Sequence, residues 1–343
     1  MGMMNEHVEA PQTDVNALRR KLRDYVQPHT ARSVYEVGIT VALFALTWAV
    51  MAVALQQGLV WLYLLGVAPA ALFLVRLFLV QHDCGHGSFF KSRAANDWTG
   101  RVIGVLTLTD YDHWRRSHAV HHATSGNLDH RGVGDIDTLT VSEYRARSRW
   151  ARLRYRAYRH PLVMFGLGPG YVFILQGRLP VGFMRKGPAL WISTMATNAA
   201  IVLLTALMIW IVGAERFFLI QIPVSLLGAS IGVWLFFVQH QFEGTHWRAD
   251  DAWNVSEAAL HGSSHYDLPG PLKWLTAHIG VHHVHHLSSR IPYYRLPEVL
   301  RDFPELRNVG RLTLGQSLRC VPLTLWDEAN QRLISFREFR QAA

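Results

Sequence analysis

Long uncharged stretches dominate the pattern of hydrophobic and polar positions along this chain. Residues 37–75 contain no Asp, Glu, Lys or Arg, and two glutamines followed by a glycine divide this run near its middle. A transmembrane helix takes about 20 apolar residues, so the run predicts two spans joined by a tight turn. Two more uncharged runs, separated by Glu215 and Arg216, predict a second pair of spans. The four predicted spans are 35–56, 59–80, 189–212 and 217–239.

Histidines gather in three clusters that lie between or after the predicted spans. The spacing is His-x-x-x-His in the first cluster and His-x-x-His-His in the other two. Side chains at i, i+3 and i+4 project from one face of a helix, which is how a helix presents several nitrogens to a metal ion. The candidate ligands are His82 and His86, then His118, His121 and His122, then His282, His285 and His286.

Two metal ions that share these histidines are the natural interpretation. A structural zinc ion takes four ligands, so eight clustered histidines are too many for one such ion. Imidazole suits iron, zinc, copper and nickel alike, and the spacing alone leaves the metal open. His240 ends the fourth predicted span, level with the clusters. We expect it to be a ninth ligand; the alternative is a surface histidine at the bilayer interface.

Other histidines near the clusters have weaker claims. His113 lies five residues before the second cluster and His278 four residues before the third, and each is a candidate for a ligand or for a supporting contact. His283 points away from the helical face that its neighbours share, so we do not expect it to bind metal.

Charged residues beside the clusters are candidates for supporting roles. A carboxylate can orient a ligand imidazole by accepting its distal N–H, and Asp83 stands inside the first cluster. The equal alternative for Asp83 and the loop acids is an ordinary loop residue. Arg76 lies in the second span, six residues before the first cluster, and the favoured interpretation is a side chain that extends to the lipid headgroups. The loop acids are Asp110, Asp112, Asp135 and Asp137.

The span count places all three clusters on one side of the bilayer. Residues 161–179 are also apolar, but four glycines and a second proline interrupt them. A fifth span there would separate the third cluster from the other two, so we expect an interfacial or re-entrant segment. Lys and Arg concentrate in the tails and the central loop, which the positive-inside rule assigns to the cytoplasm. The single predicted domain, 1–343, divides into a cytoplasmic tail (1–34), a helical hairpin (35–80), a cytoplasmic loop with the first two clusters (81–187), a second hairpin (188–241) and a cytoplasmic C-terminal part with the third cluster (242–343).

Composition and charge narrow the class of protein. Only 17% of the residues are charged and the net charge is +9, yet the basic residues flank hydrophobic spans, which argues against a nucleic-acid partner. The arginines of 145–159 are expected on the anionic inner leaflet, with a solvated helix as the alternative. Cys84 and Cys320 are the only cysteines and imply no disulfide framework. The polar first 30 residues predict no cleavable signal peptide.

The strings around the clusters resemble the membrane fatty acid desaturase family, and within it the bacterial and plant delta-12 (omega-6) type. They read HDCGHGSFF at 82–90, WRRSHAVHHATSGN at 114–127 and HHVHHLSSRIPYYR at 282–295. The likeness runs from about residue 35 to about residue 300. Three histidine boxes alone also occur in related hydroxylases and ketolases, and the flanking strings narrow the resemblance to desaturases.

The resemblance implies an all-α integral membrane protein, with four transmembrane helices and a cytoplasmic helical cap that carries the three histidine boxes. It implies a non-haem diiron centre bound by the eight cluster histidines, and His240 matches a histidine that the family often places there. Such enzymes use O2 and two electrons to remove two vicinal hydrogens from a fatty acyl chain. One departure is His278, where relatives often have Asn. No fused cytochrome b5 domain is recognised, so a separate electron donor is expected, and ferredoxin would suit a basic surface.

The predicted function is therefore a delta-12 acyl desaturase that converts oleoyl to linoleoyl chains at the bacterial inner membrane. A hydroxylase, acetylenase or ketolase on the same diiron scaffold is the alternative. A histidine-rich membrane metal transporter is a distant one, since it would need ligands at mid-bilayer. The acyl carrier, the bond position and the substrate-binding residues stay open.

Overall fold

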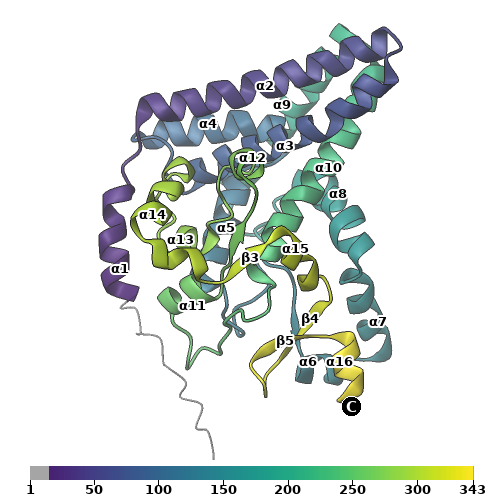
Figure 1. The fold of residues 1–343 in the computed structure, drawn as a ribbon. Helices are drawn as coiled ribbons and strands as arrows, with labels where there is room; N and C mark the ends of the chain where they lie inside the picture. Colours follow the sequence, from purple (N-terminus) through teal and green to yellow (C-terminus); the bar gives the residue numbers. More distant parts are fainter. Residues whose placement is uncertain (1–14, 343) are drawn as a thin grey trace, which may run out of the picture.

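Helices dominate the computed structural model, which describes residues 15–342. Figure 1 shows the short helices and the strands gathered below the long helices. Residues 1–14 of the predicted N-terminal tail lie outside the described residues. The expectation of an all-α fold is wrong in one respect, because two small sheets are present.

Four long helices match the four predicted spans. Each has an 18-residue window with a mean hydropathy between 1.8 and 2.2, and within 15–342 no other helix is long and apolar enough to cross a bilayer. Two of them extend past the predicted apolar runs and carry polar residues at their ends. The helices are α2 (Thr30–Gln56), α3 (Val60–Gly85), α9 (Pro188–Val212) and α10 (Ala214–His240).

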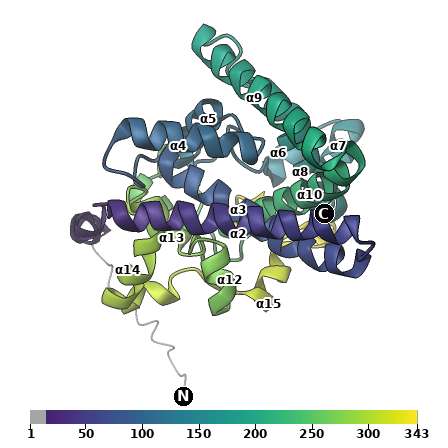
Figure 2. The ribbon, with the colours of Figure 1, turned by 90° about the horizontal axis from the view of Figure 1, so that it is seen from above.

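The long helices form two hairpins of different character. Helices α2 and α3 run side by side (Figures 1 and 2), and Gly58 makes the turn between them with a φ of 71° that disfavours larger residues. Helix α10 packs across α3, whereas α9 diverges from the others in Figure 2. The apolar window of α9 has no buried residue, and Trp210 is 82% exposed. Such a helix is apolar on all sides and needs lipid around it.

Twelve shorter α-helices build the rest of the described chain. Those before α9 are α1 (Val15–Lys21), α4 (Arg93–Leu106), α5 (Tyr111–Thr124), α6 (Val141–Ala146), α7 (Arg149–Tyr158) and α8 (Gly168–Gly170). Those after α10 are α11 (Val255–His261), α12 (Gly270–Leu275), α13 (His282–Leu287), α14 (Leu296–Asp302), α15 (Leu314–Ser317) and α16 (Phe336–Gln341). The 3-10 segments are Leu22–Tyr25, Gln176–Arg178, Tyr293–Arg295, Pro304–Asn308 and Leu318–Cys320.

The two sheets join segments that are far apart in the sequence. In the first, β1 pairs in parallel with β4, which pairs antiparallel with β5, and Leu139 stands opposite Leu325. In the second, β2 pairs in parallel with β3. The strands are β1 (Leu139–Thr140), β2 (His265–Asp267), β3 (Arg311–Thr313), β4 (Leu323–Asp327) and β5 (Arg332–Ser335).

The apolar segment predicted to be interfacial is an irregular helix. Val163–Leu167 and Tyr171–Leu175 are π-helical turns on either side of α8. Leu167 and Leu175 are 74% and 63% exposed. This segment does not qualify as a fifth span, and its position at the bilayer surface stays a prediction.

The helices that carry the histidine boxes share one hydrophobic core. Leu77 and Val80 of α3, Phe237 of α10, and Val284 and Leu287 of α13 are at most 2% exposed and belong to the same buried cluster. Packing of this kind holds side chains in fixed rotamers, so the ends of α3, α10 and α13 are held in register.

Candidate metal centre

Nine histidines converge in two groups, and they are the eight predicted cluster ligands together with His240. Within each group, one nitrogen of every ring lies within 4.8 Å of the others. No other group of this size that could hold a metal ion is found in the described chain. The first group is His82, His86, His118, His122 and His285, and the second is His121, His240, His282 and His286.

The two groups do not correspond to the three boxes. Helix α5 gives His118 and His122, one turn apart, to the first group and His121 to the second. Helix α13 gives His285 to the first group and its other two box residues to the second. Each of these helices therefore lies between the two groups and contributes to both.

The nitrogen positions fit two metal ions. Imidazole nitrogens bind metals such as zinc at about 2.0–2.1 Å, so two ligands at a right angle stand about 3 Å apart. In the first group, Nε2 of His118 lies 3.1 Å from Nε2 of His86 and from Nε2 of His122. In the second, Nε2 of His282 lies 3.0 Å from that of His240 and 3.1 Å from that of His286.

Burial keeps these imidazoles neutral, which is the form that binds metal. Six ligand candidates lie outside the spans and have a shifted pKa. Desolvation lowers the pKa of each imidazole well below the usual range, and neighbouring imidazoles lower it further. The six candidates are His86, His118, His122, His282, His285 and His286.

Two of the acids with an open role contact candidate ligand histidines. Asp83 Oδ1 accepts from His82 Nδ1 at 2.9 Å, and Asp135 contacts Nδ1 of His121. Nε2 of His121 is buried and has no hydrogen-bond partner, as expected of a nitrogen reserved for a metal. The second oxygen of Asp83 accepts the Tyr293 N–H at 2.7 Å. Each carboxylate selects the tautomer with a free Nε2.

The other three acids do not orient ligands. Asp110 accepts from Ser193 and Thr194 at the start of α9, and Asp112 pairs with Arg101 at 2.9 Å. Asp137 contacts Arg159 through its backbone carbonyl. These residues tie the loop to the scaffold, so the alternative of structural loop acids is the correct one for them.

The weaker histidine candidates lie outside both groups. The Nε2–H of His113 donates to the Val181 carbonyl at 2.8 Å. His278 has a φ of 52°, and burial followed by the charge of Arg76 lowers its pKa to about 4. His283 is fully buried and donates to the Leu306 carbonyl at 2.9 Å, which confirms that it turns away from its neighbours.

Arg76 does not extend to the headgroups, and that interpretation is wrong. It is 1% exposed and pairs with Glu36 of α2, which is also 1% exposed. Its guanidinium also contacts the Trp274 carbonyl and lies 4.1 Å from the centre of that indole ring. Glu36 in turn accepts from the Tyr293 hydroxyl at 3.1 Å. This pair connects the first hairpin to Tyr293, whose N–H binds Asp83.

The arginine-rich segment is also less uniform than predicted. Arg159 is 4% exposed and donates to Gln241 and to the Leu323 carbonyl. It therefore joins α7 to the residue after His240 and does not face a membrane surface. Other arginines of the segment, such as Arg154, are exposed.

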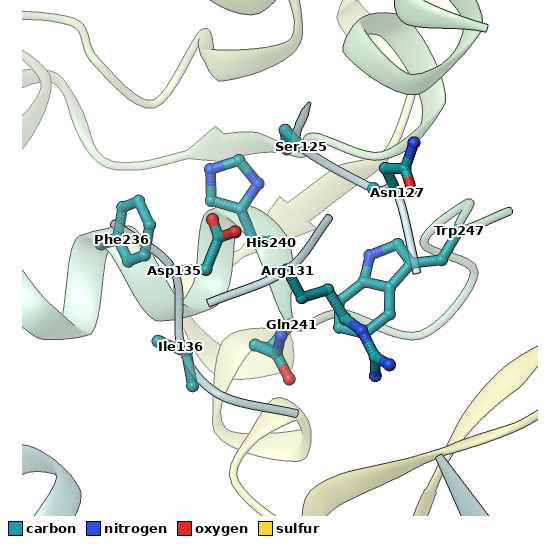
Figure 3. Close-up of a pocket in the computed structure, with 10 residues that line it drawn as sticks. Ser125, Asn127, Arg131, Asp135, Ile136, Phe236, His240, Gln241 and Trp247 are labelled. Carbon is teal, nitrogen blue, oxygen red and sulfur yellow. The ribbon is translucent and has the colours of Figure 1, made fainter. Parts of the chain in front are cut away.

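A small cavity of about 30 Å³ lies beside the second group. His240 and Asp135 line it together with Arg131 and Gln241 (Figure 3). This volume suits a single water molecule with polar partners. The cavity therefore places the polar side chains of Asp135, Arg131 and Gln241 around one space beside His240.

Comparison with known proteins gives one consistent result. The fatty acid desaturase family matches residues 59–313. A fatty acid desaturase of Bacillus subtilis (strain 168) is 44% identical over 328 residues, which cover 94% of this chain and 91% of that protein. An sn-1 acyl-lipid omega-3 desaturase (ferredoxin) of Synechocystis sp. is 33% identical over 64% of this chain and 61% of its own length. An sn-1 oleoyl-lipid 12-desaturase of the same organism is 30% identical over 64% and 62%.

Proposed function

The chain belongs to the fatty acid desaturase family, and we propose that it introduces a cis double bond at the delta-12 position of oleoyl chains. It is thus an oxidoreductase with helices apolar enough to cross a membrane. The observation that carries the proposal is the convergence of nine histidine nitrogens in two groups, from the ends of α3 and α10 and from α5 and α13. An unactivated methylene C–H is not acidic enough for a protein side chain to remove its proton, so the site must hold a redox cofactor.

Two iron ions are the proposed cofactor, one for each group of histidines. When bound, iron supplies the activation of O2 that removal of two vicinal hydrogens requires. The protein orients the ligands: Asp83 fixes the ring of His82, and Asp135 fixes that of His121. Neutral imidazoles and their carboxylate partners fit this cofactor better than a structural role.

The bond position is proposed from resemblance. The strings that flank the boxes are similar to those of delta-12 enzymes, and relatives from Synechocystis sp. and Picosynechococcus sp. carry the name sn-1 oleoyl-lipid 12-desaturase. An omega-3 relative is similar to a comparable degree. The depth of the acyl site decides which bond reaches the histidines, so product analysis is the direct test.

The proposed orientation places both termini, the histidine groups and the short helices in the cytoplasm. The support is the concentration of Lys and Arg in the tails and the central loop. Electrons would come from a separate donor, and the name of one relative includes ferredoxin. A small acidic protein of that kind suits the net charge of +9.

The test is the fatty acid profile of a bacterial host that lacks polyunsaturated lipids, measured by gas chromatography–mass spectrometry. Expression of the protein should convert oleate to linoleate, and His285→Ala should abolish the conversion while the protein still inserts in the membrane. The matched control is His283→Asn, which changes a buried histidine of the same helix outside both groups. A hydroxylated or acetylenic product would show that the enzyme is a hydroxylase or an acetylenase and not a desaturase. Full activity of His285→Ala would refute the ligand assignment.

A further inference from the structure

A cleft of about 840 Å³ opens beside the first histidine group. Five segments line it: the end of α3 with the loop that follows, the side of α4 that faces α5, α5 itself, the start of α9, and the loop that contains Arg290. Its inner end includes Cys84 and His86. The volume falls in the range of small-molecule sites, roughly 300–1,000 Å³.

The lining of this cleft is strongly basic. It holds seven Lys or Arg side chains and two Asp side chains. Asp97 and Asp112 are already paired, with Arg115 at 2.7 Å and Arg101 at 2.9 Å respectively. Four further cations of the lining form no ion pair within residues 15–342, and all four are exposed. They are Lys91, Arg116, Lys186 and Arg290.

The cleft lies at the level where the headgroup layer of a bilayer is expected. Lys186, Ala189 and Leu190 line it at the point where α9, an apolar span, begins. Helix α4 forms another wall, and its outward stripe includes Trp98 and Val102, which are 65% and 62% exposed. An apolar stripe flanked by Lys and Arg is typical of a helix that lies in the membrane interface.

We propose that this cleft binds the phosphate of the acyl carrier and that the substrate is a glycerophospholipid. The inference rests on the proposed function, since it names the carrier of the acyl chain on which the histidine groups act. Unpaired cations favour phosphate through charge-assisted hydrogen bonds, whereas a neutral glycolipid offers them nothing of equal strength. The headgroup phosphate would lie among Arg116, Lys186 and their neighbours, and the acyl chain would extend past His86.

An acidic protein fits these observations less well. A protein interface takes about 20–30 residues on each side and a broad surface, whereas the cleft is concave and 17 residues line it. Its mouth also lies at the start of a membrane span, where lipid has direct access.

The experiment compares the iron-loaded full-length enzyme with a double variant, Arg116→Gln with Lys186→Gln. The matched control is Arg152→Gln with Arg154→Gln, which removes the same charge from α7, away from the cleft. Substrates are dioleoyl-phosphatidylglycerol, dioleoyl-monogalactosylglycerol and oleoyl-coenzyme A, presented in matched detergent micelles. Calorimetric titration of the iron-free protein with dioctanoyl-phosphatidylglycerol measures binding without turnover.

We expect phosphatidylglycerol to be the preferred substrate. The cleft variant should raise its KM, and the Kd of the dioctanoyl probe, about tenfold, while kcat changes less than about twofold. The galactolipid KM should stay unchanged in the cleft variant, and the control should match the wild type. Equal iron content of all three proteins excludes misfolding as the cause.

Other results overturn the inference in distinguishable ways. Equal use of both lipids, with no effect of the cleft variant, would refute the phosphate site but would leave the proposed desaturase function unaffected. A preference for oleoyl-coenzyme A would assign the phosphate to a thioester carrier and overturn the phospholipid. A higher KM for an acidic electron donor, with lipid kinetics unchanged, would make the cleft a protein-docking surface. If no substrate is desaturated, the proposed function fails, and the calorimetric Kd alone decides the cleft.

Discussion

The buried pair between Arg76 and Glu36 gives the sharpest test of how the first hairpin supports the metal centre. We consider Arg76→Met, which keeps an unbranched side chain of similar reach and removes the charge. Glu36 would then remain 1% exposed, with Arg32 at 2.7 Å and the Tyr293 hydroxyl at 3.1 Å as its remaining partners. The companion variants are Glu36→Gln and the double variant.

The magnitude follows from these remaining contacts. Removal of one partner from a buried ion pair costs about 3–5 kcal/mol, whereas replacement of both is often nearly neutral. Because Arg32 still contacts Glu36, we expect about 3 kcal/mol for Arg76→Met and about 1 kcal/mol for the double variant. For a chain of 343 residues, 3 kcal/mol lowers the melting temperature by roughly 4 °C.

Differential scanning fluorimetry of the purified protein in detergent measures these shifts, and elemental analysis of iron serves as the second readout. The double variant should recover about 2 of the 3 kcal/mol lost in Arg76→Met. The coupling free energy is this recovery plus the loss measured for Glu36→Gln alone. If Arg76→Met shifts the melting temperature by less than about 2 °C, or if the losses of the single variants simply add, the pair is not a closed buried unit and the reasoning fails.

Three further predictions concern the histidine groups and their surroundings. His240→Ala should lower the iron content towards one ion per chain, whereas His283→Ala should keep the wild-type content; equal iron in both would contradict the second group. Asp135→Asn should weaken metal affinity about 10–100-fold in a competition titration, and an unchanged affinity would reduce Asp135 to a loop residue. His278 has a pKa of about 4 in the folded protein, against about 6.5 in the unfolded chain. The unfolded chain therefore binds the proton more readily, and the folded protein loses stability as the pH falls from about 6.5 to about 4. At pH 5 that loss is about 2 kcal/mol. His278→Asn, which tolerates the positive φ, should remove it, so an identical acid shift of the melting temperature in both proteins would refute the assignment.

The spans could be predicted because composition alone decides whether a helix survives in lipid. The end of α3 was less predictable. This helix continues past the predicted span, to Gly85, since its polar end faces protein and is buried there. An apolar pattern marks where lipid contact stops, and the helix itself can continue into a protein core.

The role of Glu36 was missed, although the sequence contained a signal for it. Glu36 and Arg76 bracket the uncharged run, each about five to six turns from the bend at Gly58. An antiparallel hairpin brings two such residues to the same level, and opposite charges there are expected to pair. Reading each span by itself led to the wrong expectation for Arg76.

The division of the histidines into two groups was beyond the sequence. Spacing identifies which histidines share a helical face, but the grouping depends on how α5 and α13 approach each other in space. The small sheets escaped prediction for a similar reason. Strand β1 has two residues and its partner β4 lies more than 180 positions later, so no local pattern announces the pairing.

The third histidine cluster contributes to both groups, which has a consequence during synthesis of the protein. During synthesis the chain emerges from its N-terminus, and four members of the first group are present once His122 has been made. The fifth member, His285, and two members of the second group belong to α13, near the end of the chain. Neither site is complete until that helix has been made and has docked. A half-made chain therefore has neither group of histidines complete.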